Sequence, residues 1–128
     1  MNNPLVLDTN LYISFFVRRD EAQFLESTKL INQLDNEQIS IFLPSLIVGE
    51  IFYILTKLYS FEKSKVCESL QSLTNLPNLI TENKEVLMLA IENYSTKNLD
   101  FADCYLLAIQ EIKNFNLITF DKKLKNQL

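Results

Sequence analysis

The stretch that most constrains the fold is Leu5-Val6-Leu7-Asp8-Thr9-Asn10, an apolar run that ends abruptly on a carboxylate. The run is too short for a helix and is typical of a buried strand. Such a strand delivers Asp8 to its carboxyl end, and ligands of open α/β sheets lie beyond those ends. We therefore expect an α/β fold with Asp8 as a candidate site residue. The structural alternative is that Asp8 only caps the helix that follows.

Length and composition indicate one domain. The chain has 128 residues, of which 48% are apolar, so a single domain spanning residues 1–128 can bury a core. No internal repeat, low-complexity tract or linker interrupts it. Gly49 is the one glycine, and asparagines take the turn and helix-stop positions instead, at Asn36, Asn75, Asn98 and Asn114.

The net charge limits the possible partners. A charge of −4 argues against a protein that coats duplex nucleic acid by charge alone. If four of the 16 Asp and Glu belong to a site, as argued below, the other 12 are equal in number to the 12 Lys and Arg. The remaining surface is neutral overall, so a short nucleic-acid substrate bridged by metal stays possible.

The cysteines and the N-terminus indicate a soluble, cytoplasmic protein. Cys67 and Cys104 have no CxxC spacing, and the chain has no histidine, which excludes a Cys/His zinc site. Both are expected to be small core residues in a reducing compartment. The start, Met1 to Pro4, lacks the features of a signal peptide, and no apolar stretch is long enough to cross a bilayer.

The pattern of apolar residues predicts short strands separated by helices. Strands are expected at residues 5–7, 39–42 and 116–119, with a further one at 78–80. A short apolar segment at 11–17 precedes a helix that starts at Asp20, with Gln23 as its capping partner. Further helices are expected at 44–59, at 61–75, after a Thr81 cap, and at 101–109 after an Asp100 cap. This order predicts a helix-rich, three-layer α/β/α sandwich with a short parallel sheet.

Glu50 lies within the helix expected at 44–59, and its helical neighbours are apolar: Leu46, Ile47, Tyr53 and Ile54. It therefore points with the apolar face, where a charged group normally needs a cation. No Lys or Arg occupies the neighbouring turns on that side, so Glu50 either belongs to a site or pairs with a distant cation. Gly49 beside it suggests that another element packs closely there.

Asp103 repeats this pattern in the helix expected at 101–109, again without a cation within one turn. Asp100 has a sufficient structural role as the cap of that helix, so we assign Asp103 to the site. Asp121 follows Thr119 at the end of the last expected strand. Its structural alternative is to cap the short basic tail.

The four acidic stretches together resemble the motifs of PIN-domain nucleases. They are Leu7-Asp8-Thr9-Asn10, Val48-Gly49-Glu50-Ile51, Phe101-Ala102-Asp103 with Leu107-Ala108, and Ile118-Thr119-Phe120-Asp121. The resemblance covers essentially the whole chain, and in size the chain is similar to the VapC-like toxins of toxin–antitoxin pairs. It departs from the pattern at Gly49, where a bulkier small residue is more usual, and in its short tail after Asp121.

The resemblance implies an endoribonuclease that uses Mg²⁺ or Mn²⁺ and leaves a 5′-phosphate. It makes Asp8, Glu50, Asp103 and Asp121 metal ligands, with Thr119 as a polar group beside them. All-oxygen ligands agree with hard cations of this kind. It also implies a homodimer that an antitoxin protein silences.

Basic residues flank two of the acidic motifs. Arg18 and Arg19 follow the first, and Lys122 and Lys123 follow Asp121, so these four side chains are candidates to hold substrate phosphates. The alternative is that they are ordinary solvated charges.

Functions of other classes stay open. An aspartyl phosphatase of the haloacid dehalogenase type would need a second Asp two residues after Asp8, where this chain has Asn10. A phosphoacceptor domain would need paired acids and more regular βα alternation. The remaining alternatives are a solitary RNA-processing PIN nuclease and a catalytically silent PIN scaffold or RNA-binding module.

Overall fold

The structure is a computed structural model that describes residues 3–128. Met1 and Asn2, part of the start at which no signal peptide is expected, lie outside the described residues. Three short strands, β1 (Leu5–Val6), β2 (Ile41–Phe42) and β3 (Leu79–Ile80), form a parallel sheet in the order β1-β2-β3. Parallel strands joined by helices confirm the predicted α/β class with a short sheet.

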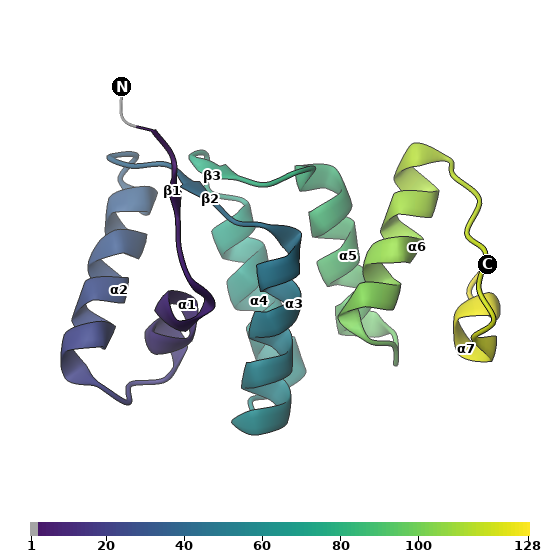
Figure 1. Ribbon diagram of the computed structural model, residues 1–128, viewed down its shortest axis with the longest axis horizontal. Helices are drawn as coiled ribbons and strands as arrows, with labels where there is room; N and C mark the ends of the chain where they lie inside the picture. The colour runs from purple at the N-terminus through teal and green to yellow at the C-terminus, as the bar shows by residue number, and fades with distance from the viewer. Residues whose placement is uncertain (1–2) are drawn as a thin grey trace.

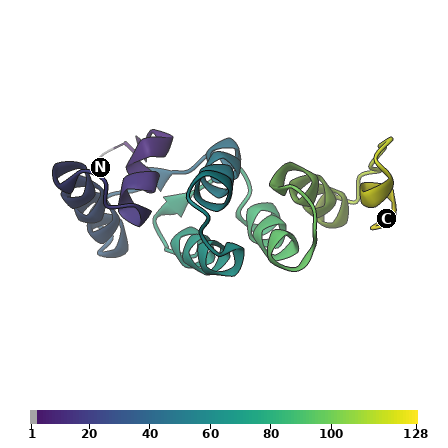
Figure 2. The ribbon, with the colours of Figure 1, turned by 90° about the horizontal axis from the view of Figure 1, so that it is seen from below.

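Helices make up most of the remaining chain and spread along its long axis from α2 at one end to α7 at the other (Figures 1 and 2). They are α1 (Thr9–Phe16), α2 (Glu21–Asp35), α3 (Ser45–Tyr53), the π-helix η1 (Ile54–Leu58), α4 (Lys63–Thr74), α5 (Lys84–Thr96), α6 (Phe101–Lys113) and α7 (Lys122–Lys125). The first two connect β1 to β2, and α3, η1 and α4 connect β2 to β3. No helix of the described chain has the length and apolarity needed to cross a membrane.

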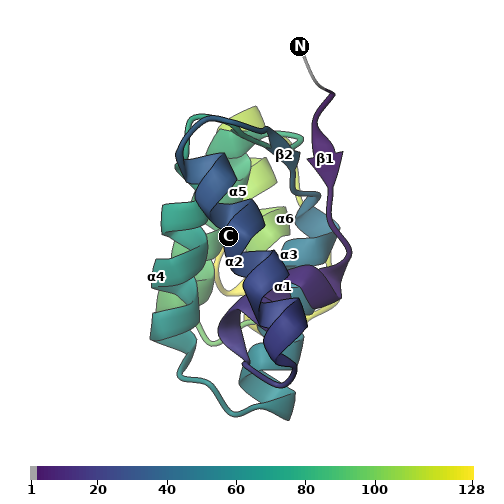
Figure 3. The ribbon, with the colours of Figure 1, turned by 90° about the vertical axis from the view of Figure 1, so that its left-hand side faces the viewer.

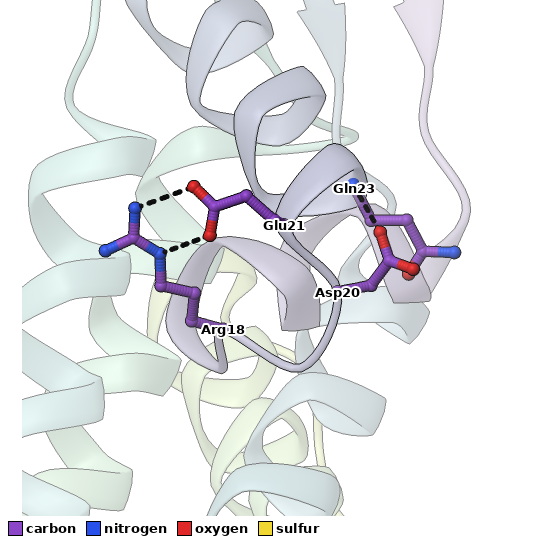
Figure 4. A network of polar contacts seen from close by, with 4 residues as sticks. All are labelled: Arg18, Asp20, Glu21 and Gln23. Carbon is purple, nitrogen blue, oxygen red and sulfur yellow. Dashed lines mark hydrogen bonds and ion pairs between the residues drawn. The ribbon is translucent and has the colours of Figure 1, made fainter.

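Side-chain caps set the starts of several helices. Asp20 begins α2 as predicted, because its carboxylate accepts a hydrogen bond of 2.9 Å from the backbone N–H of Gln23 (Figure 4). Asn83, not Thr81, caps α5, since Asn83 Oδ1 accepts from the Val86 N–H at 3.0 Å. The predicted Thr81 cap is therefore wrong, and the Thr81 hydroxyl donates to Glu82 instead.

Two expected elements differ from the observed ones. Residues 116–119 were expected to form a strand, but the structure shows them without strand pairing, because they connect α6 to α7 at a distance from the three-stranded sheet (Figure 1). The helix expected at 44–59 begins at Ser45 and changes at Ile54 into a π-helix, in which the Tyr59 N–H bonds the Ile54 carbonyl five residues back.

The core lies between the sheet and the helices around it. Ile41 of β2, Leu79 of β3 and Leu7, directly after β1, are buried in it. Aromatic rings join α3 to the α5–α6 pair: the ring centroids of Phe52 and Tyr94 lie 4.4 Å apart, and those of Phe52 and Phe101 lie 5.2 Å apart. This contact fixes the position of α6, which carries Asp103, relative to α3, which carries Glu50.

Candidate active site

Asp8 lies directly after β1, at the N-cap position of α1, and its carboxylate makes no capping hydrogen bond. The residue is exposed. The purely structural role considered for Asp8, as a cap, is therefore not realised. Its neighbour Thr9 is buried, and the Thr9 hydroxyl donates a hydrogen bond of 2.8 Å to Glu50 Oε2. This bond ties the carboxyl end of β1 to α3.

Glu50 lies on an apolar face of α3, but that face is open. Leu46, one turn before it, is 75% exposed, and Tyr53, one turn after it, is 60% exposed. Glu50 points with that apolar face as expected, but it is itself exposed, so its charge is not buried. The physical reason is that α3 has two apolar faces, and the opposite one, with Val48 and Phe52, packs into the core.

No cation pairs with Glu50 among residues 3–128, where the ion pairs are Arg18–Glu21 and Lys65–Glu68. The Thr9 hydroxyl is its polar partner instead. Gly49 faces α6: a Cβ at that position would lie 3.4 Å from Cδ2 of Phe101, which agrees with the close packing expected there.

A groove of about 800 Å³ is lined by α3 and by the first turns of α6, which pack together at its base. Its lining is mainly apolar, and its two carboxylates are Glu50 from α3 and Asp100 from the start of α6. Lys57 of η1 also lines it. The groove has the composition of a binding cleft, because it combines exposed apolar side chains with one acid on each wall and one cation.

Asp100 has a different role from the one predicted for it. It occupies the N-cap position of α6, but its side chain makes no capping hydrogen bond and is exposed on the groove. The assignment of Asp100 to the helix start alone is therefore incomplete, since its carboxylate stays available for other partners.

Asp103 lies one turn into α6 and is half-buried. Burial raises the pKa of its carboxyl group above the ordinary value, and the negative charges of Asp121 and Asp100 raise it further. Asp103 therefore lies near both Asp100, which precedes its helix, and Asp121, which precedes α7.

Asp121 begins α7 and does act as a cap. Its Oδ1 accepts a hydrogen bond of 2.9 Å from the Leu124 N–H, so the structural role considered for it is present. Its own backbone N–H donates to the Thr119 hydroxyl at 3.0 Å. Thr119 is therefore next to Asp121, as a polar group beside the acid would be.

The acids fit a hard divalent cation by their chemistry, because carboxylate oxygens are the ligands that Mg²⁺ and Mn²⁺ prefer. The positions of these acids within one chain fit a metal site less well than their chemistry does. Within residues 3–128, no three Asp, Glu or Cys side chains lie close enough to hold one ion together. The described part of the chain therefore brings acids together as neighbours, such as Asp103 with Asp121, and not as a group of three.

The candidate phosphate-binding residues differ in their availability. The Arg18 guanidinium forms two hydrogen bonds of 3.0 Å to the Glu21 carboxylate (Figure 4) and lies over the Phe24 ring. That pairing favours the structural alternative for Arg18. Arg19 lies 5.7 Å from the centroid of the Tyr59 ring. Lys122 and Lys123 are exposed on α7, directly after Asp121.

Two residues near the acids were not assigned to a site from the sequence. Thr9 orients Glu50 through its hydrogen bond. The sequence feature that could have indicated this role is a hydroxyl residue directly after the acid at the end of a strand. Asp100 lines the same groove as Glu50. The sequence feature that could have indicated this is its position about one helical turn before Asp103.

The fold and these acids define an α/β protein with exposed carboxylates at and beyond the carboxyl end of a parallel strand. The PIN domain family matches residues 5–127, so the chain belongs to that family. PIN domains have a nuclease-type fold. Their nuclease activity is generally metal-dependent, and the metal is commonly Mg²⁺ or Mn²⁺. Comparison with curated proteins and with solved structures finds no significant match.

Proposed function

We propose that this chain is a metal-dependent endoribonuclease that hydrolyses RNA phosphodiester bonds, and that it is the toxin of a toxin–antitoxin pair. The observation that carries the proposal is its membership of the PIN family over residues 5–127. The uncapped carboxylate of Asp8 supports it, because an acid at the end of a strand with no structural partner is available for chemistry.

In this proposal Asp8, Glu50, Asp103 and Asp121 supply the oxygen ligands, and Thr119 lies beside Asp121. When bound, a divalent ion at such a site offsets the repulsion between carboxylates and polarises the phosphodiester. Thr9 holds the Glu50 carboxylate in position. Arg18 is paired with Glu21, so Lys122, Lys123 and Arg19, which form no ion pair within residues 3–128, are the proposed phosphate-binding residues.

The proposed partners follow from the same site. An antitoxin that silences the nuclease would insert a cation among these acids, and an Arg side chain suits this role because its guanidinium binds carboxylates through two hydrogen bonds. The toxin would act as a homodimer in the cytoplasm.

Metal-dependent cleavage of a structured RNA tests the nuclease. We expect cleavage with Mn²⁺ or Mg²⁺ that EDTA stops, and a loss of at least about 10-fold in Asp8→Asn. Mn²⁺ should raise the melting temperature of the wild type by binding the native state, and not that of Asp8→Asn. Asp35→Asn, at the exposed end of α2, is the matched control and should behave as the wild type does.

Absence of cleavage from folded protein, with melting curves indifferent to millimolar Mn²⁺, would support the silent scaffold instead. Expression of the chain alone tests the toxin role. Growth should stop with the wild type and continue with Asp8→Asn. Normal growth despite abundant folded wild-type protein would contradict the toxin role and leave the nuclease to the cleavage assay.

A further inference from the structure

A second pocket, of about 370 Å³, lies toward the end of the molecule away from the sheet (Figures 1 and 2). The C-terminal halves of α5 and α6 line it together with residues 114–116 and 127–128. In the view from the α2 end, β1 and β2 lie in front and the C-terminal residues lie behind the other helices (Figure 3). The pocket is therefore separate from the groove that α3 and α6 line and from the carboxyl end of β1.

Carboxamide side chains are the most frequent polar groups in the lining of this pocket. They are Asn93, Gln110, Asn114, Asn116 and Gln127. Of these five, only Asn93 uses its side chain in a hydrogen bond within residues 3–128, which its Nδ2 donates to the Cys104 carbonyl at 3.4 Å. A carboxamide has two donor hydrogens and one acceptor oxygen. Most of this hydrogen-bonding capacity is therefore free for a ligand.

An aromatic ring and a cation lie among the carboxamides. Phe115 lines the pocket and is 60% exposed, so its ring is a platform on which a planar base can stack. Lys97 also lines the pocket and forms no ion pair within residues 3–128, so its ammonium group can hold a backbone phosphate. Stacking rings, polar groups that read base edges and phosphate-binding cations are the groups that bind unpaired nucleotides.

The C-terminal end of α6, which borders the pocket, favours a ligand that donates hydrogen bonds. Asn114, with φ of 57°, ends the helix, and no backbone N–H of the described residues bonds the carbonyls of residues 111–113. These free carbonyls and the helix dipole give this end a negative partial charge. Glu111 lines the pocket and adds carboxylate acceptors. The amino group of a base is therefore favoured here over a base carbonyl.

We propose that this pocket binds an unpaired adenine base of the RNA substrate, which stacks on Phe115 and is read by the surrounding carboxamides. Asn and Gln pair with adenine through two hydrogen bonds, one accepted from its N6 amino group and one donated to N7. The N6 amino group is also the donor that the end of α6 favours. The role in RNA cleavage rests on the proposed function, whereas the affinity for adenine does not.

The position of the pocket on α6 relates it to the candidate acids. Asp103 and Gln110 lie about two turns apart on this helix, roughly 10 Å along its axis. Stacked nucleotides rise about 3.4 Å each, so a strand of a few nucleotides can reach from the pocket to Asp103. The pocket would then select which base lies a few nucleotides from the cut.

Binding of short RNAs in EDTA tests the pocket without reference to cleavage. Fluorescence anisotropy measures the Kd of labelled adenylate, uridylate and cytidylate hexamers for the full chain. We expect the wild type to bind the adenylate hexamer most tightly, and Phe115→Ala to lose about 5-fold or more of that affinity, because the base loses its stacking partner. Phe120→Ala is the matched control, since Phe120 is 100% exposed in the same stretch but does not line the pocket.

The carboxamides are tested by base preference. Gln110→Leu combined with Asn116→Leu should lower the preference for adenylate over uridylate by about 5-fold or more, since discrimination between bases depends on these hydrogen bonds. Gln33→Leu combined with Asn32→Leu on α2 is the matched control and should keep the preference. Competition with free AMP and UMP on the wild type needs no substitution, and AMP should displace the adenylate hexamer at lower concentration than UMP does.

Several outcomes would overturn the adenine pocket. They are equal affinity of the wild type for the three hexamers, tightest binding of the uridylate or cytidylate hexamer, and a folded Phe115→Ala chain that binds the adenylate hexamer as the wild type does. A wild type that prefers adenylate but cleaves no RNA would contradict the proposed nuclease and support the pocket. Metal-dependent cleavage by a wild type without adenine preference would support the nuclease and overturn the pocket.

Discussion

The hydrogen bond between Thr9 and Glu50 predicts a measurable coupling between β1 and α3. Thr9→Val removes the hydroxyl and nearly keeps the side-chain volume. Hydrogen bonds to charged groups contribute about 1.5–3 kcal/mol to stability. Thr9 is 6% exposed but Glu50 lies on the open surface, where water replaces the lost donor at the carboxylate. We therefore expect a coupling energy below this range, about 1 kcal/mol.

A double-mutant cycle measures this coupling. Urea denaturation followed by circular dichroism in EDTA gives the free energy of unfolding for wild type, Thr9→Val, Glu50→Ala and the double variant. Thr56 supplies the matched control, because its hydroxyl donates to the Phe52 carbonyl at 2.7 Å within the same helical stretch. Thr56→Val combined with Glu50→Ala should be additive.

One result of the double-mutant cycle would refute the coupling between Thr9 and Glu50. If the Thr9→Val and Glu50→Ala losses add to within about 0.3 kcal/mol, the hydrogen bond does not couple the two elements and Thr9 does not position Glu50. Glu50→Gln keeps an acceptor oxygen, so its cycle with Thr9→Val should retain part of the coupling. No coupling in the Glu50→Gln cycle would show that the carboxylate charge adds nothing to this contact, whereas coupling as large as in the Glu50→Ala cycle would show that the amide keeps none of it.

Three further predictions concern buried or crowded groups. The raised pKa of Asp103 means that the folded state binds its proton more tightly than the unfolded state does, so stability falls as pH rises above the ordinary carboxyl value of about 3.9. Asp103→Asn in EDTA should therefore gain stability relative to wild type between pH 4 and pH 7, and a difference that does not change with pH would contradict this. The Tyr12 hydroxyl is buried without a hydrogen-bond partner among the described residues, so Tyr12→Phe should keep or raise the free energy of unfolding; a loss above about 1 kcal/mol in urea denaturation would refute the absence of a partner. Burial raises the pKa of the Cys67 thiol and takes that of Cys104 to about 11, so native protein at pH 8 should react slowly with Ellman's reagent, and rapid labelling without unfolding would be the contrary result.

Much of the fold could be predicted from the sequence because its signals are local. The apolar run at residues 5–7 and its polar stop predict β1, and the Asp20 carboxylate predicts the start of α2. The strand expected at 116–119 has the same local character, but a strand also needs a partner edge. The sequence reports the tendency of that stretch to extend, whereas its pairing depends on where α6 leaves it.

The environment of the candidate site residues could likewise be predicted only in part from the sequence. Apolar neighbours on a helix do not reveal which of two apolar faces the rest of the chain covers, and Glu50 lies on the open one. Position alone also does not reveal whether an acid caps a helix. Asp100 and Asp121 both occupy N-cap positions, yet the side chain of Asp121 accepts the capping hydrogen bond and that of Asp100 does not. The assignment of the four acids as metal ligands stays a prediction.

The scarcity of glycine has a consequence for the unfolded ensemble. The chain's one glycine lies in α3, so the left-handed backbone positions at Glu37, Ser60 and Asn114 carry side chains. Such positions raise the energy of the folded backbone by about 1–2 kcal/mol each relative to glycine. A chain without glycine at these turns also has fewer conformations to lose when it folds, which offsets part of that energy. The sharp turns of this protein are therefore stabilised partly by restriction of the disordered chain, a contribution that no contact in the folded structure records.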